Sequence, residues 1–372
     1  MRSHSSLWHD WSAQVRALAP SARKSQTTVL SLFVLGVVEA TAVTASRVAA
    51  AIAPPEVQVE STARRFRRML GNPAFDPGTI WTEPLTALLA RWRGQRVTLV
   101  FDPTPLGKAW TGLVLSIVWQ GRALPVAWLA VPQQAPWPRS EAAMLEEVLG
   151  QVAAALPEVK GVTVLLDRGL SGPGIVDAVG KFGFDVVLRL RAGEQDALRV
   201  RRADGSVCRI GEVVTGPGQH HRERVAIFKG AGWREGWLTI RWDVAHGEPL
   251  VLFSTRPGGP WRAAEYRKRM TVEATYGDLK SRGFNLEGTR LEQAERWERL
   301  LVGVALALWW MFVLGRHAER RGLRPKFARA DRQAMATWRL GWLWMRWLRA
   351  VGERVPLVCK RSPSGWLLSV PL

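Results

Sequence analysis

The sequence predicts an α/β fold in which helices flank a mixed β-sheet, with an all-β insertion and a helical N-terminal region. Between residues 95 and 190, short apolar strands alternate with helical segments, the pattern of a sheet covered by helices. Between residues 191 and 261, short strands are separated by glycine-rich turns. Residues 1–94 contain helical segments and breaks but no strand pattern.

Two strands of the predicted sheet end in an aspartate. "RVTLVFD" ends in Asp102, and "VTVLLD" ends in Asp167. Two further strands, "GLVLSIVW" and "ALPVAWLA", lie between them and are joined by the short turn "QGR". The strands that end in aspartate are apolar throughout, so we expect them to be buried at the centre of the sheet. Functional sites gather at the carboxyl ends of such strands.

The charge balance points to a polyanionic partner. The 372 residues include 52 Lys and Arg against 32 Asp and Glu, a net charge of +20, which indicates nucleic acid or an anionic membrane. The first residues lack the pattern of a signal peptide, so we expect a cytoplasmic protein. The apolar run at residues 300–315 is shorter than the ~20 residues of a membrane span, and we expect a buried core helix there and no membrane.

An arginine-rich helix is predicted in the N-terminal region, in "STARRFRRML". Its position and charge favour contact with DNA phosphates, although a solvated charged face is the more usual meaning of such a run. The arginines concerned are Arg64, Arg65, Arg67 and Arg68.

The segment "EYRKRMTVEATYGDLKSRG", residues 265–283, surrounds one central carboxylate, Glu273, with basic side chains. On a regular helix, five positions of this segment fall within an arc of roughly 80°. They are Tyr266, Arg269, Glu273, Gly277 and Lys280. The helix would therefore present a carboxylate, two cations and a phenol on one face.

Three carboxylates on a buried sheet are costly unless a cation gathers them. Asp102, Asp167 and Glu273 offer the hard oxygen ligands that suit Mg²⁺ or Mn²⁺. Two such ions about 4 Å apart can activate a water and stabilise a leaving oxygen, which is phosphodiester chemistry. Arg269 and Lys280 would hold the negative backbone against the metal ions.

This pattern resembles the ribonuclease-H-like core of the DDE transposases. The spacing of Tyr266, Arg269, Glu273 and Lys280 matches the YREK signature of the insertion-sequence-four family. Asp102 in "VFDPT" and Asp167 in "LLDRG" complete the resemblance, which extends over residues 96–350.

The resemblance implies a bacterial insertion-sequence enzyme associated with the nucleoid. Its members cut an element out of double-stranded DNA at terminal inverted repeats and join the 3′ ends to target DNA, as homodimers on the DNA. Asp102, Asp167 and Glu273 would hold two Mg²⁺ ions, or Mn²⁺, while Tyr266, Arg269 and Lys280 would contact phosphates. The implied division is a DNA-binding region at 1–94, a catalytic core at 95–190 and 262–350, an insertion at 191–261, and a tail at 351–372.

One position departs from the family pattern. In relatives a tryptophan that stacks on a flipped base begins the apolar strand before the signature helix, whereas Leu250 stands there in this sequence. Trp242 is a candidate replacement, and Trp261 is another. Two other functions remain open: an inactive, transposase-derived DNA-binding protein, and a membrane-associated protein built around residues 300–315.

Overall fold

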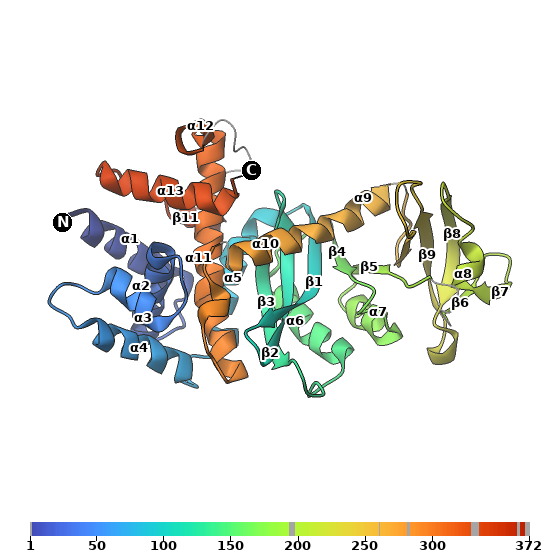
Figure 1. The fold of residues 1–372 in the computed structure, drawn as a ribbon, viewed down its shortest axis with the longest axis horizontal. Coiled ribbons are helices and arrows are strands. Elements are labelled where there is room, and N and C mark those ends of the chain that lie inside the picture. The colour runs from blue at the N-terminus through green and yellow to red at the C-terminus, as the bar shows by residue number, and fades with distance from the viewer. Residues whose placement is uncertain are drawn as a thin grey trace.

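The chain forms an elongated molecule with a helical body at one end and a long β-sheet at the other (Figure 1). The computed structural model describes residues 2–192, 198–259, 261–280, 283–328, 335–362 and 365–368. The fold class predicted from the sequence, a mixed sheet flanked by helices, is confirmed.

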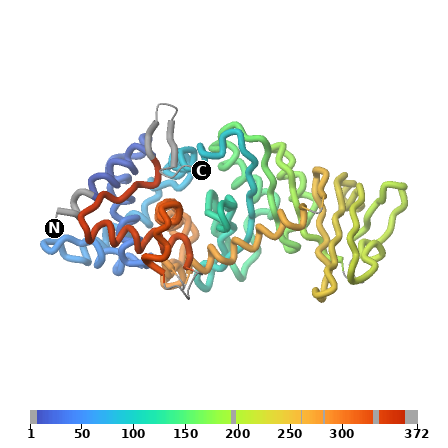
Figure 2. The backbone as a smooth tube through the Cα atoms, turned by 90° about the horizontal axis from the view of Figure 1, so that it is seen from above, coloured from blue at the N-terminus to red at the C-terminus, as the bar shows by residue number. Residues whose placement is uncertain are grey.

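The helical body is built from both ends of the chain. Figure 2 shows the blue N-terminal helices beside the red C-terminal ones. Trp11 stacks on Trp310 with ring centroids 4.2 Å apart, and the indole of Trp342 donates to the carbonyl of Val38 at 2.9 Å. The helices are α1 (Arg2–Leu18), α2 (Lys24–Ala40), α3 (Ala45–Ile52), α4 (Val59–Gly71), α5 (Pro77–Leu89), α11 (Ala294–Arg320), α12 (Arg324–Phe327) and α13 (Thr337–Ala350), with the 3₁₀ turn η1 (Ala90–Trp92).

Ten strands form one mixed sheet in the order β3-β2-β1-β4-β5-β10-β9-β8-β6-β7. β1 and β4 pair in parallel, as do β4 and β5, while the other pairs are antiparallel. The core strands are β1 (Arg96–Leu106), β2 (Trp110–Trp119), β3 (Arg122–Pro132), β4 (Gly161–Leu166) and β5 (Asp185–Arg189). β1 contains Asp102, and Asp167 directly follows β4. These two strands are therefore neighbours in the interior of the sheet.

The strands of residues 191–261 extend this same sheet at its β5 edge. β10 pairs with β5, so the insertion continues the core sheet outward instead of forming a separate layer. Residues 193–197 and 260 lie outside the described part of the chain. The elements are β6 (Arg199–Arg201), β7 (Val207–Arg209), α8 (Ile210–Val213), β8 (His220–Ile227), η2 (Lys229–Ala231), β9 (Arg234–Arg241) and β10 (Leu250–Ser254).

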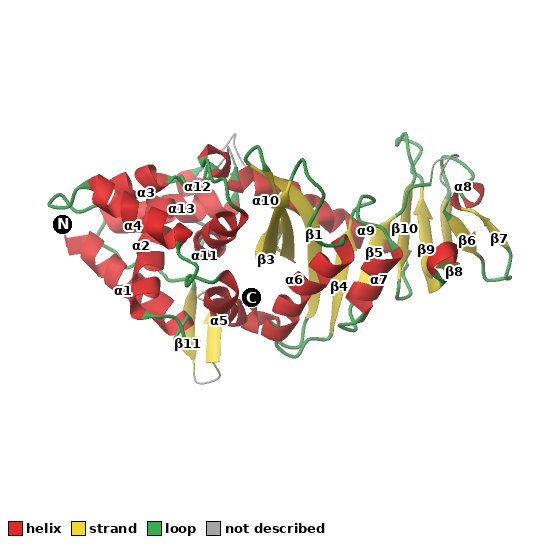
Figure 3. Cartoon of the chain, turned by 90° about the horizontal axis from the view of Figure 1, so that it is seen from below, coloured by secondary structure: helices red, strands yellow, loops and turns green. Residues whose placement is uncertain are grey.

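Helices cover the two faces of the sheet differently. α6 (Glu141–Ala155) and α7 (Pro173–Gly180) lie on one face, toward the viewer in Figure 3. The other face is crossed by α9 (Trp261–Arg267), the 3₁₀ turn η3 (Lys268–Met270) and α10 (Thr271–Leu279). Tyr266 and Val272 pack there on Val100 and Leu165.

Two sequence predictions about these elements are wrong in detail. Asp102 does not end its strand, because β1 continues to Leu106 through its antiparallel pairing with β2. The helix of Glu273 is not regular, since η3 interrupts it, and it ends at Leu279, so Lys280 lies beyond it. Beyond this end the chain turns back closely on the helix, since a Cβ on Gly283 would lie 1.7 Å from the carbonyl oxygen of Asp278.

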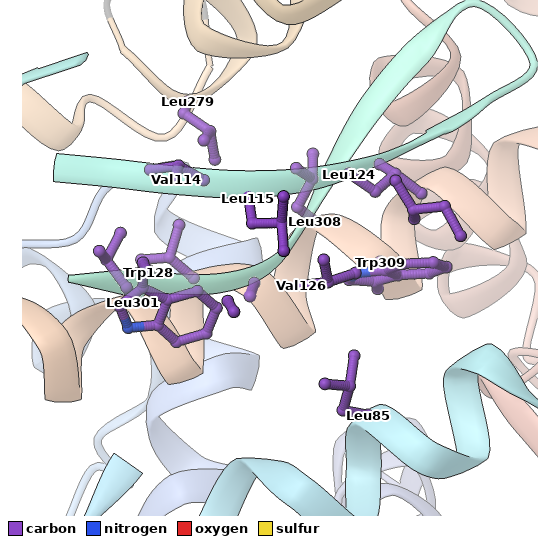
Figure 4. Close-up of a cluster of buried hydrophobic side chains, with 14 of the residues drawn as sticks. Leu85, Val114, Leu115, Leu124, Val126, Trp128, Leu279, Leu301, Leu308 and Trp309 are labelled. Atoms are coloured by element: carbon purple, nitrogen blue, oxygen red, sulfur yellow. The ribbon is translucent and has the colours of Figure 1, made fainter. Parts of the chain in front are cut away.

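The apolar run at residues 300–315 belongs to α11, which joins the helical body to the sheet. α11 is long and apolar enough to cross a membrane, as are α2 and α3 if they count as one bent span, but 89% of its apolar window is buried within the fold. Trp309 and Leu308 pack against Leu124 and Val126 of β3 (Figure 4), and the Trp309 indole donates to the carbonyl of Pro125 at 3.0 Å.

The predicted tail at 351–372 includes a short hairpin of β11 (Cys359–Ser362) and β12 (Gly365–Leu368). Residues 363–364 and 369–372 lie outside the described part of the chain. One further 3₁₀ turn, η4 (Leu286–Gly288), leads from the Glu273 helix toward α11.

α11 and α13 cross at two glycines. A Cβ on Gly341 would lie 2.0 Å from the carbonyl oxygen of Met311, and one on Gly315 would lie 1.8 Å from that of Thr337. Since both obstacles are backbone atoms, neither can move aside without separating the helices.

We expect Gly341→Ala to lower the free energy of unfolding by about 3 kcal/mol, because the new methyl group forces the two helices apart. Urea denaturation measures the change. Gly150→Ala, in the middle of α6, is the matched control: its Cβ would meet only the Phe182 ring at 3.7 Å. That variant should be as stable as the parent or up to about 1 kcal/mol more stable. Equal stabilities for Gly341→Ala and the parent would contradict the close crossing.

Candidate active site

Asp102 and Asp167 are brought side by side by the pairing of β1 with β4. The parallel ladder ends at the pair Phe101 and Leu166, so the two aspartates are the next residue on each strand. Side chains alternate between faces, which places both carboxylates on the face of Val100 and Leu165. This is the face that α9 and α10 cross.

Arg269 lies between the two aspartates. Its Nη1 donates to Asp102 Oδ1 at 2.6 Å, and its Nη2 is 3.8 Å from Asp167 Oδ2. The contact is sheltered, with 14% of the Arg269 side chain and 16% of the Asp102 side chain exposed. The guanidinium thus offsets part of the repulsion between the two carboxylates.

Two tyrosines complete this arrangement. The hydroxyl of Tyr266 donates to Asp167 Oδ1 at 3.3 Å, and that of Tyr276 donates to the backbone carbonyl of Asp102 at 3.0 Å. Burial raises the pKa of Tyr266 to about 12, so this phenol acts as a donor at neutral pH. Tyr276 was not among the residues singled out from the sequence, because its distance from Asp102 along the chain hides the contact.

The charge of Glu273 also acts on Asp102. Burial raises the pKa of Asp102 to about 6; Arg269 opposes the rise, and the charges of Asp167 and Glu273 add to it. Burial lowers the pKa of Arg269, but Tyr266, Asp102 and Asp167 outweigh this effect, so the pKa of Arg269 is raised. The site therefore gathers negative charge and holds one cation against it.

The carboxylates of the site are ligands of the kind that divalent cations prefer, but in this structure the Arg269 guanidinium lies between Asp102 and Asp167. Among the described residues, no three His, Cys, Asp or Glu side chains stand close enough to hold a metal ion. Asp102, Asp167 and Glu273 supply hard carboxylate oxygens, and the guanidinium between the two aspartates marks a position where positive charge is favoured. The buried Nε of Arg269 has no hydrogen-bond partner in the described part of the protein.

Two other residues predicted from the sequence, Lys280 and Trp242, have their own contacts outside the group of Asp102, Asp167 and Arg269. Lys280 follows α10, is 3.6 Å from Glu287 Oε1, and lines a small cavity with Thr104 of β1. Trp242 follows β9, and its indole donates to the carbonyl of His246 within the β9–β10 loop at 2.9 Å. The structure therefore does not place Lys280 on the helix face of Glu273.

The arginines of α4 are far from the carboxylates. α4 lies on the opposite side of α11 from the sheet (Figure 1). Phe66, Met69 and Leu70 are buried, and the four predicted arginines are exposed. Arg64 and Arg67 both pair with Glu60, at 3.4 and 2.7 Å.

A row of arginines extends across the sheet from the aspartates. Residues paired across neighbouring strands share a face, and the registers carry the Asp102 face through Arg189 to the far edge. The twist of the sheet turns this face gradually, so the row follows a curved surface. The arginines on it are Arg189, Arg241, Arg222, Arg224, Arg201, Arg199 and Arg209.

Sequence reasoning also missed three residues beside Asp167. Glu248, in the β9–β10 loop, accepts from Arg189 at 2.7 Å and from Arg168 at 3.2 Å. A signal was present: Arg189 ends "DVVLR" as Asp167 follows "VTVLL", so parallel strands predict that the two lie together.

Comparison with known proteins gives three findings. The comparison with curated proteins found no match. Among solved structures, a piggyBac transposase synaptic complex with hairpin DNA is similar over 90% of this chain and 74% of that one, at 9% identity and a TM-score of 0.47. The transposase DDE domain family matches residues 102–310, more than half of the chain, beginning at Asp102 itself. The chain belongs to the transposase DDE domain family.

Proposed function

We propose that this protein is a cut-and-paste transposase of the insertion-sequence-four family, which cleaves DNA at the ends of its element and joins the 3′ ends to a target. The observation that carries the proposal is the pair of aspartates on adjacent parallel strands with Arg269 between them. Family membership supports a transposase, and the spacing of Tyr266, Arg269, Glu273 and Lys280 supports the subfamily.

DDE transposase domains generally use divalent metal ions. In this protein Asp102, Asp167 and Glu273 would hold two ions, Mg²⁺ or Mn²⁺, which would supply an activated water and stabilise the leaving oxygen. The pKa of Asp102, about 6, leaves this carboxylate mostly ionised at neutral pH and able to act as a ligand.

With metal ions bound, Arg269 would bind a DNA phosphate. Once its two aspartates have another positive partner, the guanidinium is released from them and can bind a phosphate, as planar arginine forks do. Tyr266 holds Asp167 in place through its hydroxyl. Lys280, weakly paired with Glu287, is available for a neighbouring phosphate.

DNA recognition would use both ends of the molecule. The exposed arginines of α4 in the 1–94 region suit the terminal inverted repeats, and the arginine row of the 191–261 insertion suits the DNA that enters the active site. The two parts of the core, 95–190 and 262–350, would carry the chemistry. Trp242, in the β9–β10 loop that also carries Glu248, is our candidate for stacking on a flipped base.

We further propose a homodimer on the DNA and a cytoplasmic, nucleoid-associated location in a bacterium. The alternative function is an inactive, transposase-derived DNA-binding protein, for which the Arg269 contact would be permanent. The two functions differ in whether added metal ions produce cleavage.

Glu273→Gln should lower metal-dependent cleavage of the DNA that flanks the gene by about 100-fold or more, because a metal ligand loses its charge. Binding to the same DNA should persist, since it depends on many Lys and Arg contacts. A gel assay of nicked DNA in Mg²⁺ measures the first, and fluorescence anisotropy the second. Glu292→Gln, at an exposed position before α11, is the control and should cleave like the parent. Undiminished cleavage by Glu273→Gln would rule out its role as a ligand.

Mn²⁺ should raise the melting temperature of the parent, because a ligand that binds only the native state stabilises it, by about 2.7 kcal/mol at 100 times its Kd. Asp102→Asn should lose most of this shift. Asp204→Asn is the control, because Asp204 lies in the exposed β6–β7 turn, where it accepts hydrogen bonds from Ser206. Thermal scans with and without Mn²⁺ measure both variants. An equal shift in Asp102→Asn would place the ion elsewhere.

A further inference from the structure

Arg168 and Arg189 flank the catalytic aspartate Asp167. The ladder of β4 and β5 ends at Leu166 and Leu188, so Asp167 and Arg189 follow it side by side. Arg168 is the next residue after Asp167. The charge of Arg189 also reaches the Tyr266 hydroxyl, which donates to Asp167. Two guanidinium groups therefore lie at the edge of the proposed active centre.

One carboxylate joins these two arginines. Glu248 Oε1 accepts from Arg189 Nη2 at 2.7 Å, and Glu248 Oε2 accepts from Arg168 Nη1 at 3.2 Å. Each oxygen thus has its own arginine. A phosphodiester also presents two non-bridging oxygens on one centre, and arginine binds carboxylates and phosphates with the same donor fork.

The position of Glu248 makes exchange for another anion feasible. Its side chain is 60% exposed, and that of Arg168 is 48% exposed, so solvent and ligands reach the contact. Ion pairs at such exposure add little to stability. One carboxylate thus bridges two guanidinium groups. The Glu248 carboxylate lies at the end of β5, where Arg189 begins the arginine row beside Asp167.

We propose that Arg168 and Arg189 form a phosphodiester-binding site next to Asp167, and that the Glu248 carboxylate occupies this site until DNA displaces it. The inference rests on the proposed function, since it places a backbone phosphate of the DNA substrate. It adds two binding residues and one internal competitor to the site. The β9–β10 loop that carries Glu248 also carries Trp242, so displacement would free the loop that holds the candidate stacking residue.

The test is DNA binding by the full chain with Glu248→Gln. Without divalent ions, fluorescence anisotropy with a labelled duplex of arbitrary sequence should show an affinity about 3- to 10-fold higher than that of the parent at low salt, because a competing charge is removed. The slope of log K against log salt should steepen by about 0.9, the value of one added phosphate contact. Glu248→Ala, which also removes the acceptor oxygens, should behave the same way.

The chain offers a matched control on the opposite face. Asp177 of α7 holds Arg234 with two bonds, at 2.6 and 2.7 Å, and Asp177→Asn removes the same charge there. That variant should bind DNA like the parent. In a chain with Arg168→Gln and Arg189→Gln, adding Glu248→Gln should give no further gain, since the site is gone.

The outcomes separate this inference from the proposed function. A parent that does not bind DNA overturns both. A parent that binds, with Glu248→Gln unchanged in affinity and salt slope, overturns only the phosphate site. A gain that Asp177→Asn reproduces, or that survives loss of both arginines, also overturns it, because the effect would then be one of net charge.

Discussion

The arrangement of the core depends on one interaction, the contact of Arg269 with Asp102 and Asp167. Adjacent parallel strands bring two carboxylates together in a sheltered position, and like charges so placed repel. A cation between the two carboxylates reduces this repulsion. In this protein the cation is Arg269, from the segment of α9, η3 and α10 that crosses the sheet. The 3₁₀ turn η3, which contains Arg269, interrupts the helix where that side chain meets the strands.

The same crossing segment is anchored at both ends. Arg262, 2% exposed, pairs with Asp185 at 2.9 Å at the start of β5, and Arg122 of β3 pairs with Asp278 at 2.9 Å near the end of α10. These contacts fix α9 and α10 over the sheet, and with them Tyr266, Arg269 and Glu273. Breaking a buried pair leaves an uncompensated charge, so the anchors resist movement. The geometry of the site is therefore set by groups outside it.

The sequence predicts local elements well and long-range contacts poorly. The apolar strands, the turn at "QGR" and the helix after Ser140 follow from local patterns, and Gln120 and Gly121 adopt the positive φ angles that a two-residue hairpin turn needs. The continuation of β1 past Asp102 could not be predicted, because it depends on the length of its partner β2. Nor could the position of the insertion strands on the β5 edge, since pairing partners leave no local signal.

Part of the candidate site was visible in the sequence and part was not. The aspartates, Glu273 and Arg269 follow a spaced pattern, whereas Tyr276 and Glu248 reach the site from positions distant in the chain. Lys280 was misplaced because helical periodicity was assumed to continue beyond Leu279, where the helix ends. Periodicity describes regular helices and fails at a 3₁₀ turn or a chain reversal.

The central claim is that Arg269 and a divalent cation compete for Asp102 and Asp167. Calorimetric titration of the metal-free protein with Mn²⁺ tests it most directly, with Arg269→Gln compared with Arg267→Gln, an exposed position on the same segment. Competition predicts about tenfold tighter Mn²⁺ binding in Arg269→Gln, because a charged hydrogen bond no longer has to be broken, and unchanged binding in Arg267→Gln. Weaker or unchanged binding in Arg269→Gln would contradict the account.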